Sequence, residues 1–261
     1  MTDILQTIVE NKRREIEALY RFNSRPANSV DDKLWLKPVY SMSQSLKDIP
    51  GGIIAEFKRR SPSKGDIFPM ADVAKIVPEY LKGGAAACSI LTDSRFFGGS
   101  AADLAIAQTL AGETPLLRKD FILSKEQIEE SRALGASAIL LVAAILSKEQ
   151  LEEFHLYAHK LNMETLVEIH SLNELDKINF QPDMLGVNNR NLSSFHTDLK
   201  HSQELASSLP KDCVWVAESG IKSPDDVKRL KDCGFIGFLI GEAFMSSPNP
   251  GETLGKFLNE L

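Results

Sequence analysis

Charged side chains of the kinds that transfer protons stand at the ends of several short apolar runs in this sequence. Glu56 and Lys58 follow Ile54 at a spacing of two, the period at which strand side chains share one face. Lys119, Glu168 and Glu218 end three later runs in the same way, and share faces with the apolar positions two before them. Carboxylates and ammonium groups are common general acids and bases. If the five groups meet, they predict an acid–base site.

The apolar runs alternate with amphipathic stretches along the chain. We expect strands over residues 52–57, 86–91, 115–118, 138–142, 165–169, 184–187, 214–217 and 235–240. We expect helices near residues 71–82, 101–112, 124–134, 147–161, 171–178, 199–208, 223–232 and 251–260. Ser124 and Ser147 each precede a Lys-Glu-Gln that can close a capping box, Ser223 precedes a proline, and Gly83, Gly135 and Gly234 stand where helices should stop. These roughly eight strand-then-helix units favour an α/β fold, the (β/α)8 TIM barrel.

An open doubly wound sheet is the alternative fold for this alternation. A dinucleotide-binding sheet would show a GxGxxG turn after an early strand, and neither this turn nor a P-loop is present. We therefore expect a single TIM-barrel domain over 1–261, with an N-terminal helical extension over 1–50 and the barrel over 51–261. The extension begins with an amphipathic helix.

In such a barrel the first, third, fifth and seventh strands share one interior layer, and the active site lies at the carboxyl ends of the strands. The five charged groups all follow odd-numbered strands, so they should converge at one mouth. Exposed ion pairs at the rim are the alternative for any one of them. Several charges of mixed sign in one layer are costly to desolvate, which favours a functional site.

Neighbouring positions could bind an anion. Asn188 and Arg190 share a face after the sixth strand, and an arginine there could hold a carboxylate with two hydrogen bonds. Gly220 and Gly241 follow the last two strands, where barrels often bind phosphate through backbone N–H groups. Simple turn chemistry is the alternative for the glycines. The basic loop over 59–65 supplies a local positive field or is merely solvated.

Composition limits the partners and the compartment. A net charge of −6 over 261 residues, without a basic block, argues against nucleic acid and against an anionic membrane. The three cysteines show no CxxC spacing, and the first residues do not form an apolar signal segment. We expect a cytoplasmic protein.

His155 and His159 are spaced as i and i+4, but we expect a surface helix there rather than a zinc site.

Short motifs in order along the chain are similar to those of the indole-3-glycerol-phosphate synthase family. They are EFKRRSPS (56–63), LTD (91–93), FFGGS (96–100), LRKDF (117–121), LVEIH (166–170), GVNNRNL (186–192), AESGI (217–221) and LIG (239–241). Each motif is modest alone, but the ordered set is specific. The resemblance implies a (β/α)8 barrel with an N-terminal segment of about this length.

The resemblance also implies an activity. It is that of a carbon–carbon lyase of the carboxy-lyase type in tryptophan biosynthesis. The enzyme closes the ring of 1-(2-carboxyphenylamino)-1-deoxyribulose 5-phosphate with loss of CO₂ and water, giving indole-3-glycerol phosphate. The partner is thus a small phosphorylated substrate. No cofactor and no metal are implied, and we expect a monomer.

The family's functional residues carry over to matching positions here. Lys119 matches the general acid, and we expect Lys58, a neighbouring cation, to lower its pKa. Glu168 matches the acid/base group of the dehydration, with Glu56 as its helper. The other implied contacts are Asn188, Arg190 and Glu218 for positioning, Ser61, Lys58 and Arg190 for anions, Phe97 and Phe121 for the aromatic ring, and Ser219, Gly220, Gly241 and Glu242 for the phosphate.

Two positions depart from the family pattern. Gly98 stands where many members have a polar residue, and Glu242 stands where a small residue often follows the glycine. A carboxylate would repel phosphate, so we expect Glu242 to use its backbone N–H and to turn its side chain outward. We also hypothesise that the loop carrying Gly65 closes over the substrate.

Two other functions compete with this interpretation. Phosphoribosylanthranilate isomerase, a related barrel, would need a cysteine near the end of the first strand, and none is present. A barrel kept only for binding should have lost Lys58, Lys119 or Glu168, and all three are present.

Overall fold

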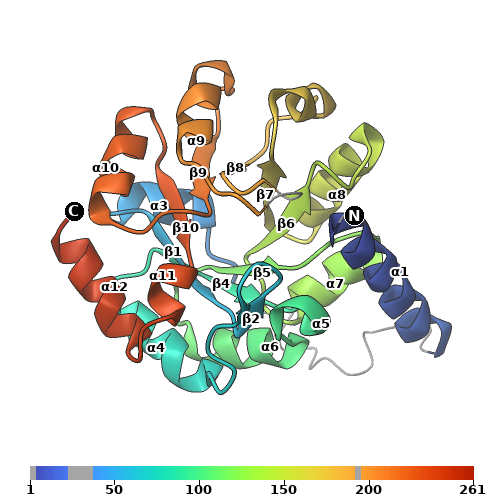
Figure 1. Cartoon of the computed structure of the whole chain (residues 1–261). Coiled ribbons are helices and arrows are strands. Elements are labelled where there is room, and N and C mark those ends of the chain that lie inside the picture. Colours follow the sequence, from blue (N-terminus) through green and yellow to red (C-terminus); the bar gives the residue numbers. More distant parts are fainter. Residues whose placement is uncertain (1–3, 23–37, 192–194) are drawn as a thin grey trace.

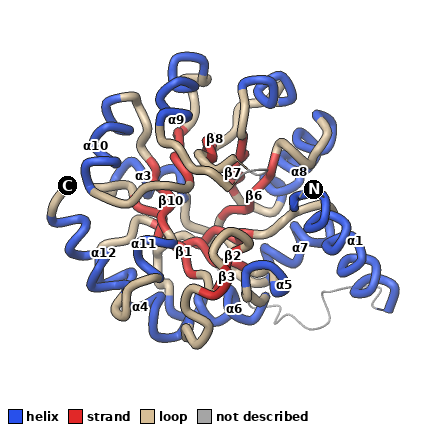
Figure 2. The backbone as a smooth tube through the Cα atoms, in the orientation of Figure 1, coloured by secondary structure: helices blue, strands red, loops and turns tan. Residues whose placement is uncertain are grey.

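The computed structural model describes residues 4–22, 38–191 and 195–261. Eight parallel strands close into a barrel in the order β1-β10-β9-β8-β7-β6-β5-β4, so neighbours in sequence are neighbours in space. Figures 1 and 2 show this ring of strands surrounded by helices. The strands are β1 (Ile53–Phe57), β4 (Ala87–Leu91), β5 (Leu116–Lys119), β6 (Ala138–Val142), β7 (Glu164–Ile169), β8 (Met184–Asn188), β9 (Val214–Glu218) and β10 (Gly237–Ile240). The predicted TIM barrel is therefore confirmed.

An outer layer of helices covers the barrel. Its members are α4 (Val73–Gly83), α6 (Ala101–Leu110), α7 (Lys125–Ala133), α8 (Lys148–Lys160), the 3-10 helix η2 (Leu172–Lys177), α9 (Lys200–Leu205) with η3 (Ala206–Ser208), α10 (Pro224–Asp232) and α12 (Pro250–Asn259). The capping box of Ser147 and Gln150 is formed, Gln127 accepts a hydrogen bond from the backbone N–H of Ser124 at 3.2 Å, and Pro224 opens α10. The stop after α4 is one residue later than predicted, because Gly84 rather than Gly83 takes the left-handed conformation.

Alternating side chains of each strand feed two separate cores, which fixes the direction of the site residues. Ile54, Leu117, Leu166 and Val216 belong to the core inside the barrel. The intervening residues, such as Ile53, Ala55 and Phe57, pack outward against the helices. The next inward position after each interior residue is at the carboxyl end, where the predicted charged groups stand.

The described part of the N-terminal extension contains two helices, which lie at different places. Helix α3 (Met42–Asp48) covers the amino-terminal end of the barrel, where Met42 and Leu46 are buried in the interior core. Glu164, the first residue of β7, accepts hydrogen bonds from the backbone N–H groups of Met42 and Ser43 at 2.7 and 2.9 Å. Helix α1 (Ile4–Phe22) lies outside the ring in Figure 1. The part of the extension over 23–37 lies outside the described residues.

Three small elements next to the site were not predicted. They are the hairpin of β2 (Arg60–Ser61) and β3 (Gly65–Asp66), and the one-turn helices α5 (Ser94–Phe97) and α11 (Glu242–Met245). Each is too short to show a period in sequence. No helix among the described residues has the length and apolar character needed to span a membrane.

Candidate active site

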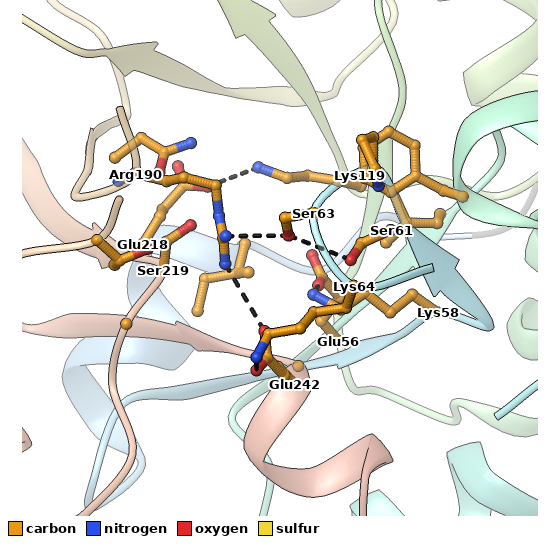
Figure 3. Close-up of a pocket in the computed structure, with 18 of the residues that line it drawn as sticks. Glu56, Lys58, Ser61, Ser63, Lys64, Lys119, Arg190, Glu218, Ser219 and Glu242 are labelled. Atoms are coloured by element: carbon orange, nitrogen blue, oxygen red, sulfur yellow. Dashed lines mark hydrogen bonds and ion pairs between the residues drawn. The ribbon is translucent and has the colours of Figure 1, made fainter. Parts of the chain in front are cut away.

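A pocket of about 740 Å³ opens at the carboxyl-terminal mouth of the barrel. Its volume is in the range of small-molecule sites. It is lined by every residue that the sequence singled out for catalysis or binding: Glu56, Lys58, Ser61, Phe97, Lys119, Phe121, Glu168, Asn188, Arg190, Glu218, Ser219, Gly220, Gly241 and Glu242. Figure 3 shows the charged members from several strands directed into one space.

Lys119 ties the ends of three odd-numbered barrel strands together. Its Nζ lies 2.9 Å from Glu168 Oε2 and 2.5 Å from Glu218 Oε2, so the ends of β5, β7 and β9 meet through one ammonium group. The Lys119 side chain is 13% exposed. Such short, largely desolvated pairs are strong because little water screens them.

The pKa of Lys119 is shifted opposite to our prediction. Burial alone would lower the pKa of this ammonium group, but the carboxylates of Glu168, Glu218 and Glu56 outweigh burial and raise it above its usual value. Lys58, the expected neighbouring cation, instead pairs with Glu56 Oε1 at 2.6 Å. The prediction of a lowered pKa was therefore wrong, because Lys58 is neutralised and carboxylates surround Lys119.

The pKa values of the two carboxyls paired with Lys119 are shifted in opposite directions. Burial alone would raise the pKa of Glu168, but Lys119 and then His170 lower it to about 2. Burial and the charge of Glu168 raise the pKa of Glu218 to about 8, although Lys119 opposes the shift. Two close carboxyls resist double ionisation, so one stays ionised while the other keeps a proton near neutral pH.

Two glycines make room for the carboxyl groups of Glu56 and Glu218. A Cβ at Gly241, after β10, would overlap Glu56 Oε1, and a Cβ at Gly186, within β8, would overlap Glu218 Oε1. Glu218 Oε1 is also buried without a hydrogen-bond partner among the described residues. The glycine of the LIG motif thus permits the position of a carboxyl, besides any role toward phosphate.

Arg190 crosses the mouth from the end of β8. Its backbone N–H donates to Asn188 Oδ1 at 3.0 Å, and its Nη1 donates to Ser63 Oγ at 3.0 Å. Ser61 Oγ lies 3.4 Å from Ser63 Oγ in the hairpin after β1. The structure therefore brings the predicted anion contacts Arg190 and Ser61 to one side of the pocket, joined through Ser63.

Glu242 does not turn outward as we expected. Its carboxylate lies 3.3 Å from Lys64 Nζ and 3.7 Å from Arg190 Nη2, and it lines the pocket. Two cations at the mouth attract it inward, which outweighs the open solvent on the other side. That part of the prediction was wrong.

Phe97 and Phe121 form the apolar wall predicted for an aromatic ring. Their ring centroids are 6.2 Å apart at an interplanar angle of 37°. Gly98, the departure from the family pattern, ends helix α5 in the left-handed conformation, with φ of 64°. A glycine fits this backbone, and its carbonyl accepts a hydrogen bond from Arg59 Nη1 at 3.0 Å.

The turn after β9, whose Ser219 and Gly220 line the pocket, has an unusual backbone. Ser219 and Gly220 both have positive φ, 64° and 82°. Asn189 Nδ2 donates to the carbonyl oxygens of Glu218 and Ser219, at 3.0 and 3.3 Å, and so fixes the turn. Consecutive unusual residues of this kind cost energy and cluster at binding sites. Leu192, which ends the neighbouring motif, lies outside the described residues.

The basic loop over 59–65 divides into structural and mouth residues. Arg59 makes a two-bond pair with Asp103, at 2.6 and 2.9 Å, and Arg60 pairs with Asp66. Lys64, by contrast, lines the pocket. The loop therefore supplies less positive field to the site than its composition indicates.

Helix α1 contributes residues to the pocket, which its sequence pattern alone does not show. Ile4, Leu5 and Ile8 of α1 line the pocket. Lys12, further along this helix, lies 3.1 Å from Asp93 Oδ2 and 3.0 Å from Asp120 Oδ1, next to Lys119 in the chain. The amphipathic pattern of α1 was visible, but a periodicity does not show which surface the apolar face covers.

His170 lies behind the acid–base cluster. Its Nε2 is 3.4 Å from Glu168 Oε1, and its Nδ1 is 3.8 Å from Glu174 Oε2. Burial alone would lower the pKa of His170, but Glu174 and Glu168 raise it. The imidazole therefore favours its charged form and helps to keep Glu168 ionised.

The histidine pair on α8 lies outside the pocket. His155 Nδ1 is 2.7 Å from Thr165 Oγ1, and His159 Nε2 is 2.9 Å from Asp183 Oδ2. These three side chains, His155, His159 and Asp183, form the one group of possible metal ligands found among the described residues. Each already has a hydrogen-bond partner within the protein.

The fold and the site together define a (β/α)8-barrel enzyme with an acid–base cluster in its mouth. A family model for indole-3-glycerol phosphate synthase matches residues 5–257. The chain belongs to this family. Among its relatives, the indole-3-glycerol phosphate synthase of Bacteroides thetaiotaomicron is 48% identical over 262 residues and covers 100% of both chains. That of Burkholderia multivorans is 39% identical, covering 98% of this chain and 99% of its own.

The membership sets the kind of enzyme. The chain is a decarboxylating lyase of tryptophan biosynthesis. A solved structure of thiamine phosphate pyrophosphorylase from Pyrococcus furiosus has a TM-score of 0.60 at 17% identity and covers 84% of this chain and 98% of its own. At that identity the likeness concerns the fold alone.

Proposed function

We propose that the acid–base cluster of Lys119, Glu168, Glu218 and Glu56 converts 1-(2-carboxyphenylamino)-1-deoxyribulose 5-phosphate into an indole by ring closure, with Lys119 as the general acid. The observation that carries the proposal is the placement of Lys119 Nζ between Glu168 and Glu218 inside the pocket. Ring closure needs a proton on the ketone oxygen as the ring carbon attacks it. Lys119 is the protonated group nearest the centre of the cluster, and its raised pKa keeps it charged before the substrate binds.

Proton donation requires that the pKa of Lys119 fall once the substrate is bound. The carboxylates that raise it are also the groups that can accept hydrogen bonds from the substrate. When Glu168 or Glu218 turns toward the substrate, Lys119 loses a partner while it remains buried, and burial favours its neutral form. Substrate binding thus prepares the acid.

The later steps fall to the carboxyls. After CO₂ leaves, a hydroxyl departs as water and a ring proton is removed. Glu168, ionised because its pKa is low, accepts the ring proton and passes it to the departing hydroxyl, which leaves as water. Glu56, paired with Lys58, assists from β1, and Glu218 positions the substrate.

The remaining contacts follow the geometry of the pocket. Arg190, Lys58 and Ser61 hold the substrate carboxylate, and a planar guanidinium suits this task. Phe97 and Phe121 pack against the aromatic ring. The phosphate lies against the backbone N–H groups of Ser219, Gly220, Gly241 and Glu242, in the loops where barrels often bind one.

The setting of the enzyme is also part of the proposal. It works in the cytoplasm as a monomer of one TIM-barrel domain, on a small phosphorylated substrate, without a nucleic-acid or membrane partner. The net charge of −6 supports the absence of such anionic partners.

A direct test supplies the purified chain with the carboxyphenylamino-deoxyribulose phosphate and follows indole fluorescence. Phosphoribosylanthranilate is offered in parallel, as the substrate of the competing isomerase. We expect indole product from the first compound and no turnover of the second. Turnover of the second compound alone would support the isomerase. Phosphate binding without turnover of either would support a barrel kept for binding.

A further inference from the structure

The cations at the pocket mouth are already occupied by a carboxylate of the chain itself. Glu242 Oε1 lies 3.3 Å from Lys64 Nζ, and Glu242 Oε2 lies 3.7 Å from Arg190 Nη2. Figure 3 shows Arg190 and Lys64 reaching Glu242 from different sides. The carboxylate therefore stands where a dissolved anion in contact with both cations would stand.

The three residues come from separate parts of the barrel rim. Glu242 follows β10, Arg190 follows β8, and Lys64 lies in the turn between β2 and β3, after β1. Ser63 of the same turn accepts the hydrogen bond from Arg190 Nη1 at 3.0 Å. Glu242 and Ser63 thus tie the turn across the mouth to the opposite wall.

An anionic substrate must compete with this internal carboxylate. Both its carboxylate and its phosphate are attracted by Arg190 and Lys64 and repelled by Glu242, because opposite charges attract and like charges repel over a few ångströms. The Glu242 side chain is 34% exposed, so water and salt weaken but do not remove these interactions. Its position is also free to change, since it can turn out to solvent without leaving a buried charge.

We propose that Glu242 is an internal competitor for the substrate's anionic groups and so sets the affinity of the site. It holds Lys64 and Arg190 when the pocket is empty, and turns away when an anion takes its place. The proposal rests on the proposed function for the identity of the anion, but the competition itself requires only an anion at the mouth.

The test uses inorganic phosphate as the probe and calorimetry as the readout, so that it does not depend on turnover. Glu242→Gln keeps the shape of the side chain and removes its charge. Glu252→Gln is the matched control, because Glu252 is exposed on α12 and pairs only with residues outside the pocket, including Lys256 at 2.7 Å. Equal melting temperatures for the three proteins show that each is folded.

We expect Glu242→Gln to bind phosphate about three- to tenfold more tightly than the unchanged chain, as for the loss of two partly exposed ion pairs. The control should bind as the unchanged chain does, and added salt should narrow the difference. In the absence of phosphate, trypsin should cleave after Lys64 faster in Glu242→Gln, because the turn has lost the ion pair of Lys64 and is held only by the hydrogen bond between Ser63 and Arg190.

Three results would overturn the proposal. Unchanged or weaker phosphate binding in Glu242→Gln would show that Glu242 holds Arg190 ready for the anion instead of competing with it. Equal tightening in the control would assign the effect to net charge. An unchanged cleavage rate after Lys64 would show that Glu242 does not restrain the turn between β2 and β3. A chain without synthase activity that still binds phosphate more tightly after Glu242→Gln would contradict the proposed function and leave this inference standing.

Discussion

Replacing Lys119 by methionine tests the centre of the proposed mechanism. Methionine has a similar length and no proton to give, so the pocket keeps its shape while the acid is lost. Positioned general acids contribute about 10²- to 10⁴-fold to rate, and Lys119 also fixes two carboxyls, so we expect kcat to fall by at least about 10³-fold. The assay is the rate of indole fluorescence increase at saturating substrate.

The same variant predicts a pH-dependent loss of stability. Without Lys119, Glu168 and Glu218 keep their burial but lose the opposite charge that lowers both pKa values. Carboxyls with folded pKa values above the unfolded ones destabilise a protein increasingly as pH rises above the unfolded value near 4.3. The free energy of unfolding should therefore fall by about 3–5 kcal/mol at pH 8 and by less at pH 5.

Lys125→Met is the matched control for both measurements. Lys125 belongs to the same strand–helix unit but lies on α7, pairs with Glu153 on the surface, and does not line the pocket. We expect nearly unchanged kcat and less than about 1 kcal/mol of lost stability, as for an exposed pair. A folded Lys119→Met that keeps more than about a tenth of the wild-type kcat would refute the general-acid assignment, because even a weak acid contributes more than that.

Three further predictions concern the neighbours of this centre. We expect kcat/KM of the unchanged chain to decline above pH 8, where Glu218, with a pKa raised to about 8, loses its proton, and we expect Glu218→Gln to lack this decline; a variant profile that keeps the decline would contradict it. In His170→Asn the acidic limb of kcat/KM should move to higher pH, since His170 helps to lower the pKa of Glu168, and an unmoved limb would show that His170 is only structural. In Lys12→Met the buried Asp120 loses one of its cations, and urea denaturation should show a loss of about 3–5 kcal/mol that is larger at pH 8 than at pH 4; a loss below about 1 kcal/mol would contradict it.

The barrel could be predicted because its signals are local. Each strand is a short apolar run and each long helix has a period of its own, often with a cap, as at Ser124 and Ser147. Closure follows once about eight such units alternate, since right-handed strand–helix–strand crossovers place successive strands side by side. The one-turn helices and the β2–β3 hairpin escaped prediction because fewer than five residues give no period.

The position of the charged groups could also be predicted, because a strand has a period of two and a barrel brings all carboxyl ends to one rim. Ile54 and Leu117 point inward, so Glu56 and Lys119 had to follow them into the mouth. The same logic does not give the partner of each side chain. Lys58 lines the same pocket as Lys119, but its ion-pair partner is Glu56, two residues before it in the chain.

The pKa of Lys119 is raised, and not lowered as predicted, because of the groups that pair with it. Lys58, Glu168 and Glu218 all line the pocket with Lys119. The pKa of Lys119 depends on which charged groups lie next to it, because Coulomb energy falls with distance and with screening. The carboxyl groups of Glu168 and Glu218 lie next to it, and the lysine is stabilised in its charged form. The position of Glu242 at the edge of the pocket also depends on its neighbours. A lone carboxylate near an anion site should turn outward, but Arg190 and Lys64 beside it give the inward position the lower energy. The charged states of Lys119, Glu168 and Glu218 are therefore a property of the set, and a substitution at Lys119 should change the pKa values of both carboxyls.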